Sequence, residues 1–308
     1  MPSNQSPLGA LPARFRRERL LIVGCGDVGM RVAKHLPPKV RVLALTSSAS
    51  RVQALREAGI TPLLGNLDQP QSLRRLAGIA QRVVHLAPPP IVGWEDTRTC
   101  ALLRALRLRG VPRTLVYGST SGVYGDCQGD WVEETRRLNA DTPRAVRRVN
   151  AEKHVRFFGR SSSARTSVLR IPGIYAPDRE GGTPKERLRK GTPVLQAQDD
   201  VFTNHIHADD LARACIAALW HAGPQRTFNV NDDTVLKMGD YMDLAADLYG
   251  LPRPLRIPRL GAQAHLPAVM LSFMGESRRL MNARMKTELG LVLRYPTVAQ
   301  GLPEPHVQ

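Results

Sequence analysis

Three glycines near the N-terminus have the spacing of a site that binds a dinucleotide phosphate. They lie in the segment GCGDVG, residues 24–29, which directly follows the apolar run 19–23 and begins a helical pattern. In such a G-x-G-x-x-G motif the first glycine permits a tight turn, the second lets a pyrophosphate approach the backbone, and the third allows close helix packing. The predicted phosphate-binding residues are Gly24, Gly26, Asp27, Val28 and Gly29.

The residues that follow the glycines bear on which dinucleotide binds. NAD-binding versions of the motif carry an acidic residue roughly 20 residues further on, whereas NADP-binding versions place an arginine near the 2′-phosphate. Residues 45–48 read Leu-Thr-Ser-Ser, without an acid, and Ser47 and Arg51 are suited to hold a phosphate. The sequence therefore predicts NAD(P) as cofactor and favours NADP, unless Arg51 is only a solvated residue in the first turn of a helix.

Alternating strands and helices must position these groups. The expected strands are residues 19–23, 40–45, 61–64, 82–86, 114–117 and 167–171. The expected helices between them are residues 28–36, 49–58, 71–76, 97–109 and 143–158. This alternation predicts the α/β class, with a doubly wound parallel sheet of the Rossmann type.

After residue 171 the spacing becomes irregular. Helices are expected at 209–219, 237–249 and 276–289, and a strand at 227–230. Three parts are therefore predicted. They are a flexible basic tail over 1–18, an NAD(P)-binding Rossmann domain over 19–171, and a smaller α/β substrate lobe over 172–308, some segments of which return to the Rossmann sheet.

Composition narrows the classes of partner. The 308 residues carry a formal charge of +17, which attracts anions. Because the arginines are dispersed and aromatics make up only 5%, no nucleic-acid partner is expected. No apolar stretch approaches the roughly 20 residues of a membrane span, and the four cysteines lack paired spacing, so a cytoplasmic protein is predicted.

Several later segments resemble the NAD-dependent epimerase/dehydratase group of extended short-chain dehydrogenases/reductases. They are GNL (65–67), YGSTSGVYG (117–125), LRIPGIYAP (169–177), HIHADDLA (205–212) and FNV (228–230). The order matches the family over about residues 19–302. The resemblance implies a small carbonyl, hydroxyl or nucleotide-sugar substrate, and a homodimer. It places these residues beside the cofactor: Asn66 and Leu67 at the adenine, and Leu86, Ala87 and Pro88 at the nicotinamide ribose.

The catalytic pattern of that family is only partly present. It consists of a Ser or Thr after the fifth strand and a Tyr-x-x-x-Lys on the next helix; Thr120 matches the first element. On the helix, Arg144 stands where the tyrosine belongs and Arg148 where the lysine belongs. Arginine stays protonated above pH 12, so Arg144 cannot exchange protons near neutral pH. The resemblance thus implies an atypical active site. In it Thr120 holds the reacting oxygen, Arg144 binds an anionic substrate group and Arg148 binds the ribose or a phosphate.

Other residues leave alternatives open. Tyr124 and Tyr175 either supply a displaced phenol or pack against the core, and Arg147 is expected to be an exposed helix residue. His205 and His207 form a His-x-His pattern next to Asp209 and Asp210, but His207 or Asp209 is expected to cap the helix that follows, so no metal site is predicted.

Two functions are consistent with the sequence. The first is an epimerase/dehydratase-like oxidoreductase with an atypical site. The second is a non-catalytic NAD(P)-binding sensor or regulatory protein, which the loss of the tyrosine and lysine favours.

Overall fold

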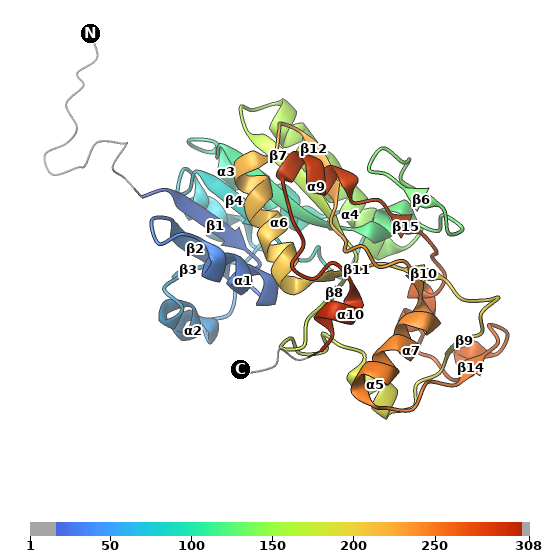
Figure 1. Ribbon diagram of the computed structural model, residues 1–308. Helices are drawn as coiled ribbons and strands as arrows, with labels where there is room; N and C mark the ends of the chain where they lie inside the picture. Colours follow the sequence, from blue (N-terminus) through green and yellow to red (C-terminus); the bar gives the residue numbers. More distant parts are fainter. Residues whose placement is uncertain (1–16, 304–308) are drawn as a thin grey trace, which may run out of the picture.

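A seven-stranded parallel sheet forms the centre of the computed structural model, which describes residues 17–303 (Figure 1). Across the sheet the strands are β3 (Thr61–Leu64), β2 (Arg41–Thr46), β1 (Arg19–Val23), β4 (Arg82–His85), β5 (Thr114–Thr120), β7 (Arg165–Ile171) and β12 (Arg226–Asn229). The chain winds outward in both directions from β1, which confirms the predicted doubly wound α/β fold. Residues 1–16 of the expected basic tail lie outside the described residues.

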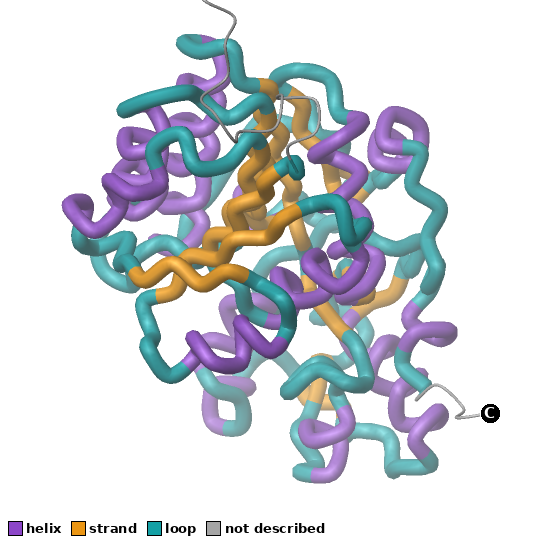
Figure 2. Tube along the Cα trace, turned by 90° about the vertical axis from the view of Figure 1, so that its left-hand side faces the viewer, coloured by secondary structure: helices purple, strands orange, loops and turns teal. Residues whose placement is uncertain are grey.

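Helices cover both faces of the sheet (Figure 2). One face packs against α1 (Asp27–His35), α2 (Arg51–Glu57), α6 (Ala208–His221) and α9 (Ala283–Leu289). The other packs against the 3-10 helix η2 (Pro70–Leu76), α3 (Thr97–Arg107) and α4 (Pro143–Arg160). The strands are apolar along their length because both of their faces are buried in these two cores. No helix within residues 17–303 is long and apolar enough to cross a membrane.

The chain after Ile171 contributes both to the sheet and to a smaller lobe. Strand β12 pairs in parallel with β7, and α6 packs against α1 and α9. The remaining helices are η3 (Ser121–Tyr124), α5 (Lys185–Arg189), α7 (Met238–Tyr249), η4 (Ala262–Ala264), α8 (Ala268–Phe273) and α10 (Val298–Gly301). The remaining strands are β6 (Trp131–Val132), β8 (Gly173–Tyr175), β9 (Val194–Leu195), β10 (Phe202–Thr203), β11 (His205–His207), β13 (Leu236–Lys237), β14 (Arg256–Ile257) and β15 (Arg279–Leu280).

The expected helix over 276–289 is wrong in its first half. Strand β15 occupies Arg279–Leu280 and pairs in parallel with β6, so α9 begins only at Ala283. The Arg279 guanidinium lies over the Trp131 ring, 5.0 Å from its centroid, and its Nε donates to the Gly129 carbonyl at 2.6 Å. A distant partner strand thus overrides the local helical pattern.

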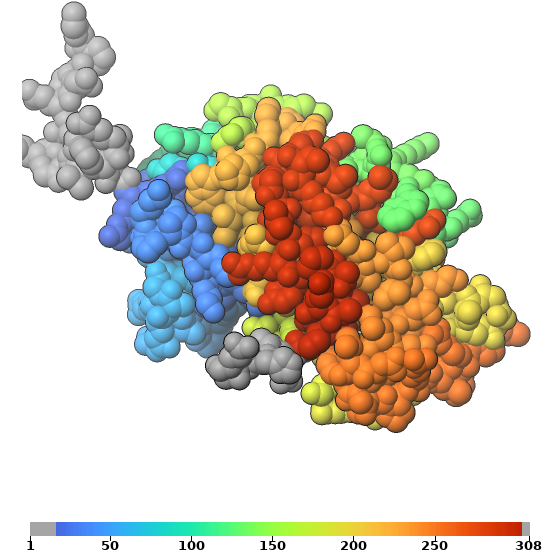
Figure 3. Space-filling view, viewed as in Figure 1, coloured from blue at the N-terminus to red at the C-terminus, as the bar shows by residue number. Residues whose placement is uncertain are grey.

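The last described segment crosses from the sheet to the lobe. Figure 3 shows it in red, between the blue N-terminal part and the orange lobe. The fully buried Asp210 anchors it: its carboxylate accepts the backbone N–H groups of Arg294 at 3.0 Å and Tyr295 at 2.9 Å. Because charge-assisted bonds of this kind are strong, this segment is held firmly against the start of α6.

Candidate cofactor and substrate site

The three motif glycines meet different surroundings. Gly24 has φ +85°, and a Cβ there would lie 2.3 Å from the Ala87 backbone nitrogen. A Cβ on Gly29 would lie 3.2 Å from the Ile22 side chain. At Gly26 a Cβ would meet no atom within 4 Å. The fold therefore requires glycine at position 24 and leaves little room for a side chain at position 29, whereas Gly26 borders open space of the kind that a pyrophosphate needs.

Helix α1 points its free amino end at that space. Gly26 is its N-cap residue, and no side chain caps the helix. The Asp27 carboxylate is held instead by Arg31 Nε at 3.1 Å and Arg179 Nε at 3.3 Å. The backbone amides of Asp27 and Val28, rather than the carboxylate, are thus the groups suited to a phosphate, which the helix dipole also favours.

The predicted adenosine end of the site carries an exposed cation. Arg51 begins α2 and has no ion-pair partner in the part of the chain that the structure describes. Burial raises the pKa of the Cys25 thiol to about 11, and the charge of Arg51 acts against that shift, so the guanidinium lies close to the glycine loop. Ser47 is exposed beside it, and the Ser48 and Ser50 hydroxyls bond to each other at 2.6 Å.

One arginine ties the two loops that border the rest of the cofactor site. Arg98 binds the Asp68 carboxylate with two bonds of 2.6 and 2.7 Å, which lowers the pKa of Asp68. It also donates to the Pro88 carbonyl at 3.3 Å. Asn66 is fixed next to this pair, because its side-chain oxygen accepts the Asp68 N–H at 2.9 Å.

Backbone bonds hold the neighbouring loop against β1. The N–H groups of Leu86 and Ala87 both donate to the Val23 carbonyl, at 2.7 and 3.1 Å, and Leu67 packs against the core beneath. The predicted adenine and ribose residues therefore form one connected rim.

Thr120 ends β5 and caps η3. Its Oγ1 accepts the Gly122 N–H at 3.3 Å, which leaves the hydroxyl proton free for a ligand. Arg148 is bound to the same strand through Nη1, which donates to the Tyr117 hydroxyl at 3.0 Å and the Gly118 carbonyl at 2.8 Å. Arg144 is exposed and lies over the Phe273 ring of α8, 4.4 Å from its centroid.

Tyr124 lies away from these groups, in a buried network. It is 1% exposed, and its hydroxyl donates to Asn229 Oδ1 at 2.7 Å and accepts from Arg170 at 2.8 Å. With both bonding directions engaged inside the core, the phenol supports packing rather than proton transfer. Arg147, expected to be exposed, is instead buried, and it donates to the Gly93 carbonyl at 2.6 Å.

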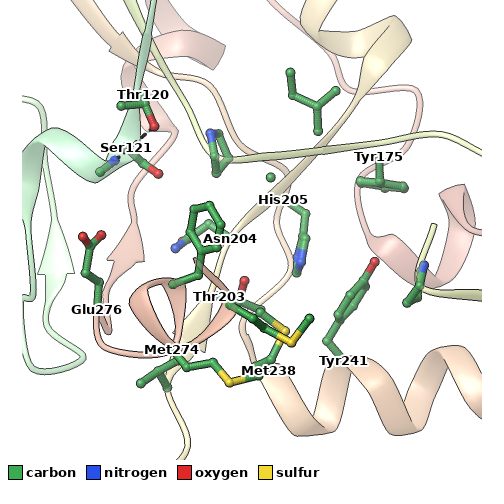
Figure 4. A pocket seen from close by; sticks show the side chains of 18 of the residues that line it. Thr120, Ser121, Tyr175, Thr203, Asn204, His205, Met238, Tyr241, Met274 and Glu276 are labelled. Carbon is green, nitrogen blue, oxygen red and sulfur yellow. Dashed lines mark hydrogen bonds between the residues drawn. The ribbon is translucent and has the colours of Figure 1, made fainter. Parts of the chain in front are cut away.

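A cavity of about 600 Å³ lies between the end of β5 and the lobe (Figure 4). Its lining includes Thr120, Arg144 and a carboxylate that sequence reasoning missed, Glu276. A Cβ built on Gly122 would lie 3.7 Å from Thr120 Oγ1 and 3.9 Å from Glu276 Oε2. The hydroxyl and the carboxylate thus flank the same glycine, although no sequence signal connects residues so far apart.

Glu276 is itself held in place by an arginine. Arg278 donates to Glu276 Oε2 at 2.7 Å and to the Gly125 carbonyl at 2.6 Å. Glu276 Oε1 has no hydrogen-bond donor among the described residues. The cavity lining therefore offers a hydroxyl donor and a carboxylate acceptor on either side of Gly122.

The two histidines of β11 are buried and serve different neighbours. The His205 ring stacks on Tyr241 at 4.2 Å, and the His207 ring stacks on Tyr295 at 3.7 Å. His207 Nδ1 accepts the Asp209 N–H at 3.2 Å and so caps α6. Burial lowers the pKa of His205 to about 3. Among the described residues no group of three or more His, Cys, Asp or Glu side chains could hold a metal.

Solved structures with a similar fold include enzymes that act on nucleotide sugars. A conserved protein of unknown function from Silicibacter pomeroyi is 28% identical, with a TM-score of 0.76 over 92% of this chain and 96% of that one. The UDP-glucose 4-epimerases of Thermotoga maritima, solved with UDP-glucose, and Thermus thermophilus, solved with NAD, are 19% and 20% identical. Their TM-scores are 0.74 and 0.71, each over 92% of this chain and 96% of the other.

No curated protein matches the chain significantly. The sequence model of the NAD dependent epimerase/dehydratase family, by contrast, matches residues 20–231, more than half of the chain. This range begins in β1, includes the glycine loop and Thr120, and ends just after β12. The chain therefore belongs to the NAD-dependent epimerase/dehydratase family.

Proposed function

We propose that this protein is an NAD(P)-binding oxidoreductase with an atypical active site, acting on a small carbonyl or hydroxyl compound in the cavity. The supporting observation is the pairing of Thr120 and Glu276 around Gly122 at the end of β5. The glycine loop would hold the pyrophosphate, and the rim formed by Asn66 and Ala87 would border the nucleosides. When bound, the nicotinamide supplies hydride transfer.

The residues of the proposed site have separate roles in proton transfer, charge stabilisation and positioning. Thr120 donates its hydroxyl proton in a hydrogen bond to the reacting oxygen, and Glu276 accepts the proton of a substrate hydroxyl. Arg144, which cannot exchange a proton, contributes positive charge beside that oxygen. Arg148 is bound to β5 and fixes the strand end that carries Thr120. The proton acceptor thus comes from the C-terminal lobe instead of α4.

Substitution of Glu276 or Thr120 tests this assignment. Glu276→Gln keeps the size of the side chain but cannot accept a proton, so kcat/KM should fall by about 100-fold or more. Thr120→Val should have a similar effect, because it removes the donor. The measurement is reduction of NADP⁺ and NAD⁺ with a panel of small alcohols, with exposed Glu186→Gln as control. Unchanged turnover in both variants would remove these residues from the mechanism.

Arg51 tests the preference for NADP. Loss of a charge-assisted bond to the 2′-phosphate costs about 1.5–3 kcal/mol, so Arg51→Gln should weaken NADPH binding by roughly 10- to 100-fold and leave NADH binding unchanged. Calorimetric titration with both dinucleotides measures this. Arg56→Gln, in the last turn of the same helix, is the matched control. Equal losses for NADPH and NADH would show that Arg51 does not select the phosphate.

A second candidate function is a non-catalytic NAD(P)-binding sensor. The exposed Arg144 in the tyrosine position, stacked on Phe273, favours it because arginine cannot exchange a proton near neutral pH as the family's tyrosine does. Such a protein would gain roughly 2.7 kcal/mol of stability at a dinucleotide concentration about 100 times its Kd, yet show no turnover. NADP preference, a cytoplasmic location and a homodimer remain predictions, and light scattering in solution tests the last.

A further inference from the structure

The end of the cavity opposite Thr120 contains an arginine without a counter-ion. Arg187 of α5 lines the cavity, and its one hydrogen bond runs from Nη2 to the thioether sulfur of Met270, at 3.6 Å. Its Nε is buried with no partner, and no carboxylate within residues 17–303 pairs with it. Burial lowers the pKa of Arg187 below its usual value. An unpaired, partly desolvated cation raises the free energy of the folded state. A ligand whose negative charge pairs with Arg187 would offset this cost.

Two further polar groups at this end also lack partners. The Tyr241 hydroxyl makes no hydrogen bond to a described residue. Burial raises the pKa of Tyr241, and the nearby charge of Arg187 acts against that shift. His205 Nδ1 is buried and has no partner among the described residues, and its ring stacks on that of Tyr241. Figure 4 shows His205 and Tyr241 together on the opposite side of the cavity from Glu276. Buried polar atoms normally have partners. Arg187 Nε and His205 Nδ1 have none among residues 17–303 and belong to side chains that line one cavity, as does Tyr241, which marks this end as a binding subsite.

The wall between the two ends is apolar. It is formed by thioether and aromatic side chains: Met238, Met270, Met274 and Phe273. Methionine side chains adapt to irregular apolar ligands but offer little to ribose hydroxyls or a base edge. The nearby Arg278 is already neutralised by Glu276, so Arg187 leaves a single positive charge to be matched at the far end.

We propose that the cavity binds an amphipathic organic monocarboxylate, with its carboxylate on Arg187 and Tyr241 and its apolar body along the methionine wall. This places the other end of the ligand beside Thr120 and Glu276. The proposal rests on the proposed function, since it names the substrate class of the same cavity. A carboxylate matches the guanidinium in charge and planar geometry. A nucleotide diphosphate carries more negative charge than Arg187 alone compensates at this end of the cavity.

Calorimetric titration with defined probes tests the proposal. Octanoate and 4-phenylbutyrate should bind, whereas octanamide and 4-phenylbutyramide, which share their shape without the charge, should bind at least tenfold more weakly. UDP-glucose should bind more weakly than either carboxylate. Arg187→Met should weaken carboxylate binding at least tenfold and leave the amides unaffected. Arg189→Met is the matched control, because Arg189 lies on the same short helix but is exposed and paired with Glu186.

Two control measurements separate a loss of the carboxylate subsite from misfolding of the variant and from a failure of cofactor binding. Arg187→Met should be at least as stable as the natural chain without ligand, since it removes an unpaired charge; this establishes folding. Titration with NADPH in parallel tests the proposed function separately, because Arg187 does not line the glycine loop. Equal affinity for carboxylates and amides, absence of carboxylate binding, unchanged affinity in Arg187→Met, or tighter binding of UDP-glucose would each overturn the carboxylate subsite even if NADPH binds.

Discussion

Gly26→Val should abolish dinucleotide binding while leaving the protein folded. Gly26 has φ −80° and ψ −153°, an extended conformation that valine readily adopts, and no protein atom lies within 4 Å of a Cβ there. The added side chain instead fills the space where the pyrophosphate would approach the amides of α1. We expect the Kd for NADPH to rise more than 100-fold, and the unfolding temperature without ligand to stay within a few degrees of the natural value.

The neighbouring glycine provides the contrast. Gly24→Ala meets both a positive φ and the Ala87 backbone nitrogen 2.3 Å away, so this smaller substitution should destabilise the fold itself. Thermal unfolding and fluorescence titration with NADPH, carried out on both variants, separate the two effects. Full NADPH affinity in a folded Gly26→Val protein would mean that the cofactor does not follow the glycine loop.

Among the variants proposed for this protein, Glu152→Ala should lower the free energy of unfolding the most. Its carboxylate is 1% exposed and accepts from Arg170 Nη2 at 2.9 Å, Arg170 Nε at 3.2 Å and the Ser119 hydroxyl at 2.7 Å. The substitution leaves Arg170, 2% exposed, as an uncompensated buried charge, which costs about 3–5 kcal/mol. Denaturant unfolding measures the free energy.

The exposed pair of Glu186 and Arg189 gives the matched control, because removing a solvated partner changes stability little. A loss for Glu152→Ala no greater than for Glu186→Ala would show that the buried pair is structurally dispensable. Because Arg170 also binds Tyr124, and Ser119 precedes Thr120, the variant should additionally loosen the strand end that carries the proposed hydrogen-bond donor.

Local patterns were sufficient for the sheet and for the glycine loop. Each central strand is buried on both sides, so its continuous apolar run is visible in isolation, and the motif 24–29 is defined within six residues. The placement of Arg144 and Arg148 on one helix likewise needs only the spacing of α4. These features depend on residues that are neighbours in sequence.

The far side of the cavity could not be predicted in this way. Glu276 reaches Gly122 through contacts between distant segments: β15 pairs with β6 and overrides a helical pattern, and Arg278 bonds to the Gly125 carbonyl. In the sequence, Arg187 is one of several charged residues on a short amphipathic helix, and the neighbouring residues do not distinguish it from the exposed Arg189. What separates them is the partial burial of Arg187 and its contact with Met270 of a later segment, which exist only in the folded chain.

The pairing of β6 with β15 also determines how late the cavity can form during synthesis of the chain. Trp131 leaves the ribosome roughly 150 residues before Arg279, which at about 5–20 residues per second is a delay of roughly 7–30 s. During that interval the strands from β1 to β5 can already assemble, but the cavity lacks both its carboxylate and its C-terminal wall. A chain stalled before Arg279 would therefore carry a glycine loop without a substrate site, and would expose the backbone edge of β6 to other partners.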